Sequence, residues 1–323
     1  NYKTNHSLYT QLDKKWNRLN ISLGARYEGF RLHSEDKYFI GGDSINDFYA
    51  GKPVFRTGLN YQAAEATYVR ASWGQGYRFP SMAELFISTI QSGLEIFPNP
   101  ELKPESGWSS EIGIKQGIKT GKWMGYIDIA GFIQQYDDMM EFSFGQWGSS
   151  GEFGGMGFKS INVGKTQITG VELSVSGQGK INHNLTINVL AGYTYMNPIS
   201  LNPKSAYAYG INHGDTTHAL TQFITDEIGD TTNTIYTLVE QPITYNNTSS
   251  DTTMLKYRYN HIAKADIEVV YKNITLGGSF RYNSFMKNID WIFTQLGGEE
   301  GMIPGLNDAR EKFKDGDLII DLR

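Results

Sequence analysis

Three features that the sequence lacks narrow its class. The 323 residues include no cysteine, so a disulfide framework, a thiolate metal site and a cysteine nucleophile are all excluded. No segment approaches the roughly 20 consecutive apolar residues that a transmembrane helix requires, and the mean hydropathy is −0.41. Basic residues are not in excess, since 29 Lys and Arg stand against 34 Asp and Glu. Nucleic-acid binding needs clustered basic residues, so this balance argues against it. Because no helix of the required length is predicted, any membrane crossing must use strands.

Signatures of catalysis and of metal binding are also missing. The sequence holds no HExxH motif and no G-x-S-x-G elbow. The acidic pairs Asp137-Asp138 and Glu299-Glu300 lack the spacing of a calcium loop. His213 and His218 share a segment with Asp215, where a metal or a haem is one interpretation and a solvated loop the other. We therefore expect no enzyme activity, no cofactor and no metal site.

The sequence is rich in period-two alternation, the pattern of strands with one apolar and one polar face. One face of the segment 19–31 carries Leu19, Ile21, Leu23, Ala25 and Tyr27, and the other carries Ser22, Gly24, Arg26 and Glu28. The same pattern returns in residues 55–61, 170–176, 185–195, 263–271 and 274–282. These segments predict amphipathic strands along most of the chain.

The spacing of the strands separates a membrane barrel from a soluble sandwich. Tight turns are predicted at residues 14–17, 62–65, 119–122, 179–182 and 272–273. The connections between them are long, far beyond the median of about 5 residues for compact domains. Strict alternation of short and long connections is typical of an outer-membrane barrel, with short periplasmic turns and long extracellular loops. Apolar stripes that end in Tyr193 and Tyr195, or in Phe280 and Tyr282, fit aromatic girdles at the headgroup level.

These patterns predict an all-β fold: a transmembrane antiparallel up-and-down β-barrel, of which about eleven strands are present. The last predicted strand covers residues 317–323. A closed bacterial single-chain barrel has an even number of strands, and unpaired strand edges leave backbone groups unsatisfied in lipid. We treat residues 1–323 as a single barrel domain and expect it to be part of a longer chain, truncated at both ends. One short helical turn is predicted near residues 307–314.

A run of motifs resembles the TonB-dependent receptors of Gram-negative outer membranes. Residues 69–80 read VRASWGQGYRFP, residues 83–86 read AELF, residues 99–105 read NPELKPE and residues 111–113 read EIG. They are similar to the family's "RASxGxGFRxP", "ELF", "NPxLKPE" and "ExG" boxes, and 162–164 with 170–172 resembles its "N-x-G…GvE" strand. The resemblance implies a barrel of 22 strands, with the signal peptide, TonB box, plug and first strands preceding this portion.

The resemblance also implies candidate functional residues. Charged side chains on the polar strand faces are expected in the lumen, either in contact with a plug or paired with one another; they are Arg70, Arg78, Glu111, Lys115 and Glu172. Ligand contacts are expected from aromatic residues of the outer loops, although such residues also pack loops together. The candidates are Tyr38, Phe39, Tyr49, Trp147, Tyr207, Tyr209 and Trp291, and the same loops hold Phe142 and Phe144.

By the same resemblance, the expected function is active, TonB-dependent transport of a scarce nutrient across the bacterial outer membrane. A siderophore, cobalamin, an oligosaccharide or a peptide all remain open as ligands. The haem receptors of the family carry a histidine between two of these motifs, and none lies between Pro80 and Asn99. The expected partners are the TonB complex, reached through the plug, the lipid bilayer, the small ligand and a surface lipoprotein. The alternatives are a structural or partner-binding barrel without transport, and a soluble all-β binding protein.

Overall fold

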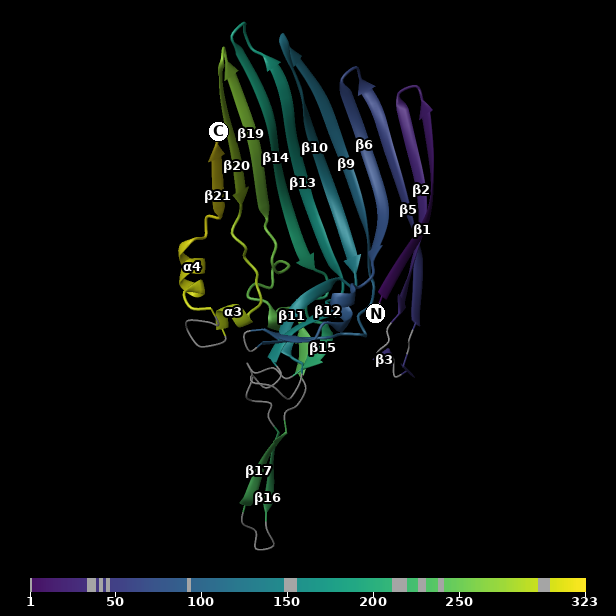
Figure 1. The fold of residues 1–323 in the computed structure, drawn as a ribbon, viewed down its shortest axis with the longest axis vertical. Helices are drawn as coiled ribbons and strands as arrows, with labels where there is room; N and C mark the ends of the chain where they lie inside the picture. The colour runs from purple at the N-terminus through teal and green to yellow at the C-terminus, as the bar shows by residue number, and fades with distance from the viewer. Residues whose placement is uncertain are drawn as a thin grey trace.

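A single sheet of eleven antiparallel strands dominates the computed structural model (Figure 1). The structure describes residues 2–33, 39–40, 43–44, 47–91, 94–147, 156–210, 220–225, 231–237, 241–295 and 303–323. The strands of the sheet are β1 (Tyr2–Trp16), β2 (Leu19–His33), β5 (Asp47–Ala64), β6 (Thr67–Arg78), β9 (Glu105–Thr120), β10 (Lys122–Asp137), β13 (Thr166–Lys180), β14 (Leu185–Ser200), β19 (His261–Tyr271), β20 (Ile274–Asn283) and β21 (Asp317–Leu322). Each pairs with the next in chain order, and the sheet is not closed. The predicted up-and-down arrangement of eleven strands is confirmed.

Short turns and long connections lie at opposite ends of this sheet (Figure 1). We call these the turn end and the loop end. The turn at residues 272–273 is as predicted, and the one predicted at 179–182 lies at 181–184. The other three turns are shorter than the sequence predicted: β1 runs through Lys14 and Lys15 to Trp16, and only Asn17 and Arg18 form the turn. Gly121 alone separates β9 from β10, in the left-handed region at φ 60°. Backbone hydrogen bonds between strands do not depend on the polarity of the side chains. The strands therefore stay paired at the turn end, where their residues become polar.

The face of the sheet that carries the apolar alternation is solvent-exposed along its middle. Ile112 is 64% exposed, Ile114 53%, Leu276 66% and Leu23 49%. Each large aliphatic side chain gains roughly 1.5–3 kcal/mol when it leaves water for an apolar medium. A continuous apolar surface of this kind is therefore suited to lipid, as expected for a transmembrane barrel.

Aromatic side chains border this apolar surface toward the loop end. Tyr193 and Tyr195 are each 40% exposed on β14. The Tyr193 hydroxyl lies 2.7 Å from Nδ1 of His261, at the first residue of β19. A ring that is apolar on its body and hydrogen-bonded at its tip suits the membrane–water boundary.

The long connections fold into small sheets and short helices rather than open loops. A four-stranded sheet contains β11 (Met140–Gln146), β12 (Met156–Asn162), β8 (Leu94–Phe97) and β7 (Thr89–Gln91), and two-stranded sheets pair β15 (Ala206–Gly210) with β18 (Gln241–Thr244), β16 (Leu220–Thr225) with β17 (Thr231–Thr237) and β3 (Phe39–Ile40) with β4 (Asp43–Ser44). The helices are α1 (Met82–Phe86), α2 (Tyr245–Thr248), α3 (Ile292–Gln295) and α4 (Leu306–Lys312). Of the helices in the described part of the chain, none has the length and apolar character to cross a membrane.

Only α4 was predicted from the sequence, and α1 shows what was overlooked. Ser81 and Glu84 form a capping box, in which the Ser81 hydroxyl accepts from the Glu84 N–H and the Glu84 carboxylate accepts from the Ser81 N–H. This S-x-x-E pattern starts a helix within the AELF motif. The motif is therefore a helical turn and not only a family marker.

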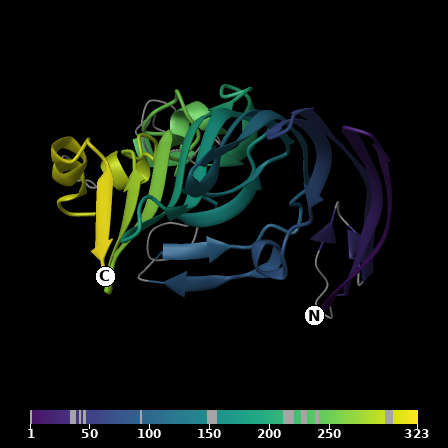
Figure 2. The same ribbon diagram turned by 90° about the horizontal axis from the view of Figure 1, so that it is seen from above.

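The sheet is curved, and part of the loop end folds onto its concave side. Figure 2 shows α1, β7 and β8 (blue) beneath the arch formed by the main sheet. These elements belong to the connection between β6 and β9, which contains most of the motifs named above. The concave side at the loop end is therefore where the wall of the sheet and the connections meet.

Candidate functional site

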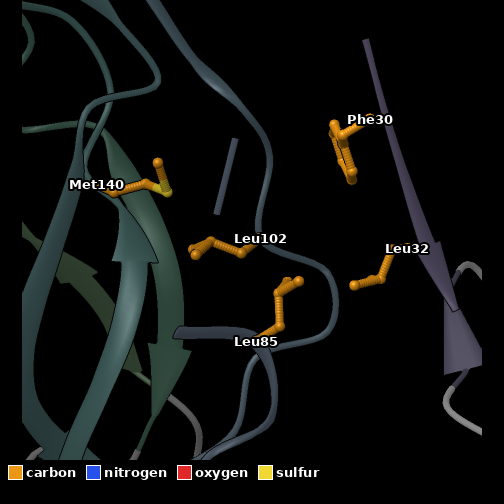
Figure 3. Packing of buried hydrophobic residues seen from close by; sticks show 5 residues of the cluster. All are labelled: Phe30, Leu32, Leu85, Leu102 and Met140. Atoms are coloured by element: carbon orange, nitrogen blue, oxygen red, sulfur yellow. The ribbon is translucent and has the colours of Figure 1, made fainter. Parts of the chain in front are cut away.

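Hydrophobic packing holds the β6–β9 connection against the concave face. Phe30 and Leu32 of β2 are 3% and 4% exposed, and they pack with Leu85, Leu102 and Met140 from two connections (Figure 3). Phe30 also meets Phe79 edge-on, with ring centroids 3.8 Å apart. The motif segment is thus anchored by buried apolar side chains at both of its ends.

The polar half of each strand shares the concave face with Phe30 and Leu32. Glu28 lies on the same face of β2 because side chains alternate along a strand. The register extends this face across the sheet: Asn60 pairs with Arg70, Arg70 with Gly113, Gly113 with Ala130, and Ala130 with Glu172. By the same alternation, all five charged residues singled out from the sequence lie on the concave face.

Arg70 joins three strands through ion pairs. Its Nε donates to Glu111 Oε1 at 2.9 Å, and one terminal nitrogen donates to Asp128 Oδ1 at 2.5 Å. A Cβ at Gly113 would lie 2.8 Å from the Arg70 guanidinium carbon, so glycine at this position leaves room for it. Arg70 therefore pairs within the wall, as one of the two interpretations of the sequence expected, with Asp128 as an additional partner.

Arg78 pairs with the motif helix rather than with the wall. Its NH1 donates to both oxygens of Glu84, at 2.8 Å and 3.0 Å. A weaker contact joins it to Glu105 at 3.9 Å. Because Glu84 also closes the capping box of α1, Arg78 fixes the helix to the end of β6.

Lys115 and Glu172 differ from the two arginines in their surroundings. The Lys115 ammonium lies 3.6 Å from the centroid of the Tyr126 ring, a cation–π contact. Glu172 is exposed and forms no ion pair with any residue in the described part of the chain. Of the five charged candidates, Lys115 and Glu172 are the two that form no ion pair within the described part of the chain.

The four-stranded loop sheet links two connections by a close backbone approach. β12 pairs in parallel with β8, so Gly157 lies opposite Glu95 and Phe158 opposite Ile96. A side chain at Gly157 would overlap the Glu95 carbonyl, which is backbone and has no rotamer to change. Glycine at 157 is therefore a condition for joining the β6–β9 and β10–β13 connections.

We expect Gly157→Ala to separate these strands, at a cost of about 1–3 kcal/mol, the usual range for overpacking. Amide hydrogen exchange of Leu94–Phe97 in the folded protein should become faster. Gly131→Ala in β10 is the matched control, because its nearest neighbour would lie 4.0 Å away. Equal exchange in both variants would show that the β8–β12 pairing does not depend on this glycine.

The aromatic ligand candidates lie in different settings. The Trp147 indole donates to the Gly157 carbonyl at 3.2 Å and packs against buried Val163 and its neighbours. The Tyr207 hydroxyl bonds Thr248 Oγ1 at 2.9 Å, and burial raises its pKa. Trp291 is half-buried and adjoins Asp290. Tyr38 lies outside the described residues, and the same holds for the side chains of Phe39, Tyr49 and Tyr209.

Phe142 has the most open ring among the aromatic residues of the four-stranded loop sheet whose side chains the structure describes. It is 46% exposed, whereas Phe144 is 2% exposed. Its ring stacks on Phe158 at 5.0 Å, and Phe158 in turn lies 6.2 Å from Phe293. Met140 occupies the same face of β11 and points into the concave packing, so Phe142 is turned toward the same space.

A buried charge cluster, not expected from the sequence, lies behind this sheet. Lys256 and Asp290 are 1% and 0% exposed, and their side chains meet at 2.8 Å. The ammonium also donates to Ser143 Oγ at 3.1 Å and lies 4.0 Å from Glu141. Burial raises the pKa of Glu141 to about 7, against the opposing effect of Lys256. No local pattern marks these residues, because Lys256 comes from an irregular segment and its partners are more than 30 positions away.

Other sequence candidates for metal binding find little support. Asp137 lies 3.2 Å from the Lys165 ammonium, and Asp138 is exposed. His213, His218, Asp215, Glu299 and Glu300 lie outside the described residues. Within the described ranges, no group of three His, Cys, Asp or Glu side chains is placed to hold a metal ion.

The arrangement of an amphipathic meander with a polar concave face can now be compared with known proteins. A family model described as "TonB dependent receptor-like, beta-barrel" matches residues 1–284. The chain belongs to the TonB-dependent receptor family. This family assignment places it in the bacterial outer membrane, as predicted, with the loop end outside the cell and the turn end in the periplasm.

Solved structures of TonB-dependent receptors have the same fold at low sequence identity. They include a copper transporter, OprC, with a TM-score of 0.57 and 14% identity over 99% of this chain and 39% of that chain. The hemophore receptor HasR of Serratia marcescens, in complex with its hemophore HasA and heme, has a TM-score of 0.56 and 15% identity over 89% of this chain and 45% of its own. The siderophore receptor PiuA of Acinetobacter baumannii scores 0.52 at 14% identity, over 99% and 36%. This TonB-dependent receptor portion spans less than half the length of these relatives, and no curated protein matches it.

Proposed function

We propose that this portion forms the wall and the outer loops of a transporter that carries a scarce nutrient across the outer membrane, driven by the TonB complex. Residues 1–323 act as a single barrel domain within a longer receptor. The TonB complex acts through a plug that occupies the concave side. The protein is not an enzyme, and its cargo is a siderophore, cobalamin, an oligosaccharide or a peptide.

The observation that carries this proposal is the polar concave face combined with connections folded over it at one end. A lumen lined by charged side chains suits a packed plug or a water-filled path, whereas a structural barrel needs only a filled interior. The anchored motif segment narrows this path at the extracellular end. A ligand held there would lie between the loops and the plug.

Lys115 and Glu172 are the proposed plug contacts. Arg70 already forms ion pairs with two carboxylates of the wall, and Arg78 forms one with Glu84 of helix α1. Exposed Glu172 and the ring-bound Lys115 keep capacity for new partners. We assign Arg70, Glu111 and Arg78 to wall and loop stability in this proposal.

Ligand contact is proposed for the concave side of the loop sheet, with Phe142 as its most open ring. Trp147, Tyr207 and Trp291 support the loops around it. An aromatic face can stack on a flat ligand or cover an apolar one. Tyr38, Phe39, Tyr49 and Tyr209 remain proposed contacts from the same end of the barrel.

The test is growth of the native bacterium, with and without the gene, on media limited in turn for iron, cobalamin, glycan and peptide. We expect the deletion to lose growth on one source, and a TonB deletion to lose growth on that source as well. Complementation with the K115A/E172A double variant should restore growth less well than the wild type. The matched control is E65A/K119A, which removes one charge of each sign at the turn end.

Growth on every source without the gene would contradict transport and favour the structural or partner-binding barrel. Full growth of the K115A/E172A strain would contradict only the plug contacts. The growth of the strains is compared only where immunoblots of outer membranes show equal amounts of each variant.

A further inference from the structure

Three of the long connections meet at one buried cluster behind the loop sheet. Glu141 and Ser143 belong to β11, Lys256 to the connection between β14 and β19, and Asp290 to the connection between β20 and β21. Two of these connections are already joined by backbone bonds, from Tyr257 N–H to the Asn288 carbonyl at 2.8 Å and from Trp291 N–H to the Thr248 carbonyl at 3.1 Å. The link to β11 depends instead on the side chains of the cluster and on the apolar residues beside them.

The cluster holds more acid than base. Lys256 is the one cation in direct contact with two carboxyl groups among the described residues of the cluster, Asp290 at 2.8 Å and Glu141 at 4.0 Å. Asp290 also accepts from the Tyr257 hydroxyl at 2.9 Å. Asp290 therefore has more hydrogen-bond donors than Glu141 and is the closer partner of Lys256. Glu141 is left as a buried carboxyl without a cation of its own, and burying an uncompensated charge is unfavourable.

We propose that Lys256, Asp290 and Glu141 form a proton-operated latch, which holds β11 against the two neighbouring connections while Glu141 carries a proton and loosens when that proton is lost. The latch joins the extracellular loops into one body around the mouth of the barrel. The latch concerns how the loops are held together and not how a ligand is carried. Its state can therefore be measured without any ligand.

The surroundings of Glu141 support this assignment of the proton. Burial is the largest influence and raises its pKa to about 7, Lys256 and Arg258 oppose the rise, and Asp290 adds to it. The phenols in the cluster stay neutral over this range because burial raises their pKa values as well; they are Tyr207, Tyr245 and Tyr257. Burial raises the pKa of Asp290 too, but Lys256 and the Tyr257 hydroxyl oppose that rise through direct hydrogen bonds, so Glu141 is the carboxyl placed to hold the proton.

The sign of the pH dependence follows from the raised pKa. A carboxyl whose pKa is higher in the closed form than the ordinary 4.5 favours the closed form when protonated. Closure is therefore strongest at acidic pH, weakens as pH rises from about 4.5 through 7, and changes little above that range. Between pH 5.5 and pH 8, the opening equilibrium constant should rise roughly 30-fold.

Hydrogen exchange of the full-length receptor in detergent, corrected for intrinsic exchange at each pH, tests the latch. We expect amides of Met140–Gln146 to open more readily at pH 8 than at pH 5.5. In E141Q, which is neutral at every pH, opening should stay low at both. E101Q is the matched control, because Glu101 is an exposed carboxylate at the same end of the barrel, and this variant should behave as the wild type.

Two results would overturn the latch. One is a wild-type opening constant that does not change between pH 5.5 and pH 8, a measurement that requires no variant to fold. The other is E141Q that opens at every pH, which would mean that the charge of Glu141 and not its proton holds the loops. Loss or retention of nutrient uptake bears on neither result, so the latch and the transport proposal fail separately.

Discussion

Replacing Lys256 by methionine is expected to lower the free energy of unfolding by about 3–5 kcal/mol, the usual cost of removing one partner from a buried ion pair. Methionine retains most of the apolar stem but leaves Asp290, which is 0% exposed, without its cation. Ser143 also loses its donor. The measurement is urea unfolding of the full-length receptor in detergent, followed by the fluorescence of its tryptophans.

Two variants show whether the loss comes from the unpaired charge. K287M removes an exposed lysine from the connection that carries Asp290, and it should change stability by no more than about 0.5 kcal/mol, as surface substitutions usually do. The double variant K256M/D290N removes both charges and should be more stable than K256M alone. If K256M unfolds at the same urea concentration as K287M, the cluster does not stabilise the loops.

Ile114→Arg is expected to destabilise the membrane-inserted protein by about 2–4 kcal/mol, the cost of a basic residue on the lipid-facing side at the bilayer midplane. Ile114 is 53% exposed on the apolar face of β9, midway between the turn and the start of the long connection. An arginine there must either enter hydrocarbon or distort the surrounding lipid. Reversible guanidinium unfolding of the receptor from lipid vesicles measures the loss.

Ser174→Arg is the matched control for this prediction. Ser174 is exposed on the concave face and pairs directly with Asp128, so a new guanidinium there lies on the polar side of the wall, beside a carboxylate. We expect its effect to be within about 0.5 kcal/mol of the wild type. Equal losses in both variants would contradict the assignment of the convex face to lipid.

The strands could be predicted because the alternation of apolar and polar residues within each strand shows which of its faces meets lipid and which meets a polar interior. Residues 19–28 and 263–269 alternate between apolar and polar side chains, and both lie in strands of the sheet. The boundaries were less accurate: Lys14 and Lys15 were expected in a turn but continue the β1–β2 ladder. Side-chain polarity reports the medium around a strand, whereas the end of a strand depends on backbone hydrogen bonds.

The candidate site was predictable in part. Parity placed Arg70, Glu111 and Glu172 on one face, and the register of the sheet agrees with that placement. Parity does not say which charges meet, so Asp128 was missed as a partner of Arg70. The pairing depends on how the strands are staggered, and the sequence of one strand does not contain that information.

By itself, the sequence determined the strand order, the alternation of short turns and long connections, and the family, because these depend on periodicity and on local motifs. Only the tertiary structure decided that Lys256, Asp290 and Glu141 meet, that Gly157 lies against Glu95, and that Phe142 stays open while Phe144 is buried. All of these contacts join segments far apart in the chain. Their geometry is set by the close packing of separate connections at the loop end, and neither composition nor spacing encodes it locally.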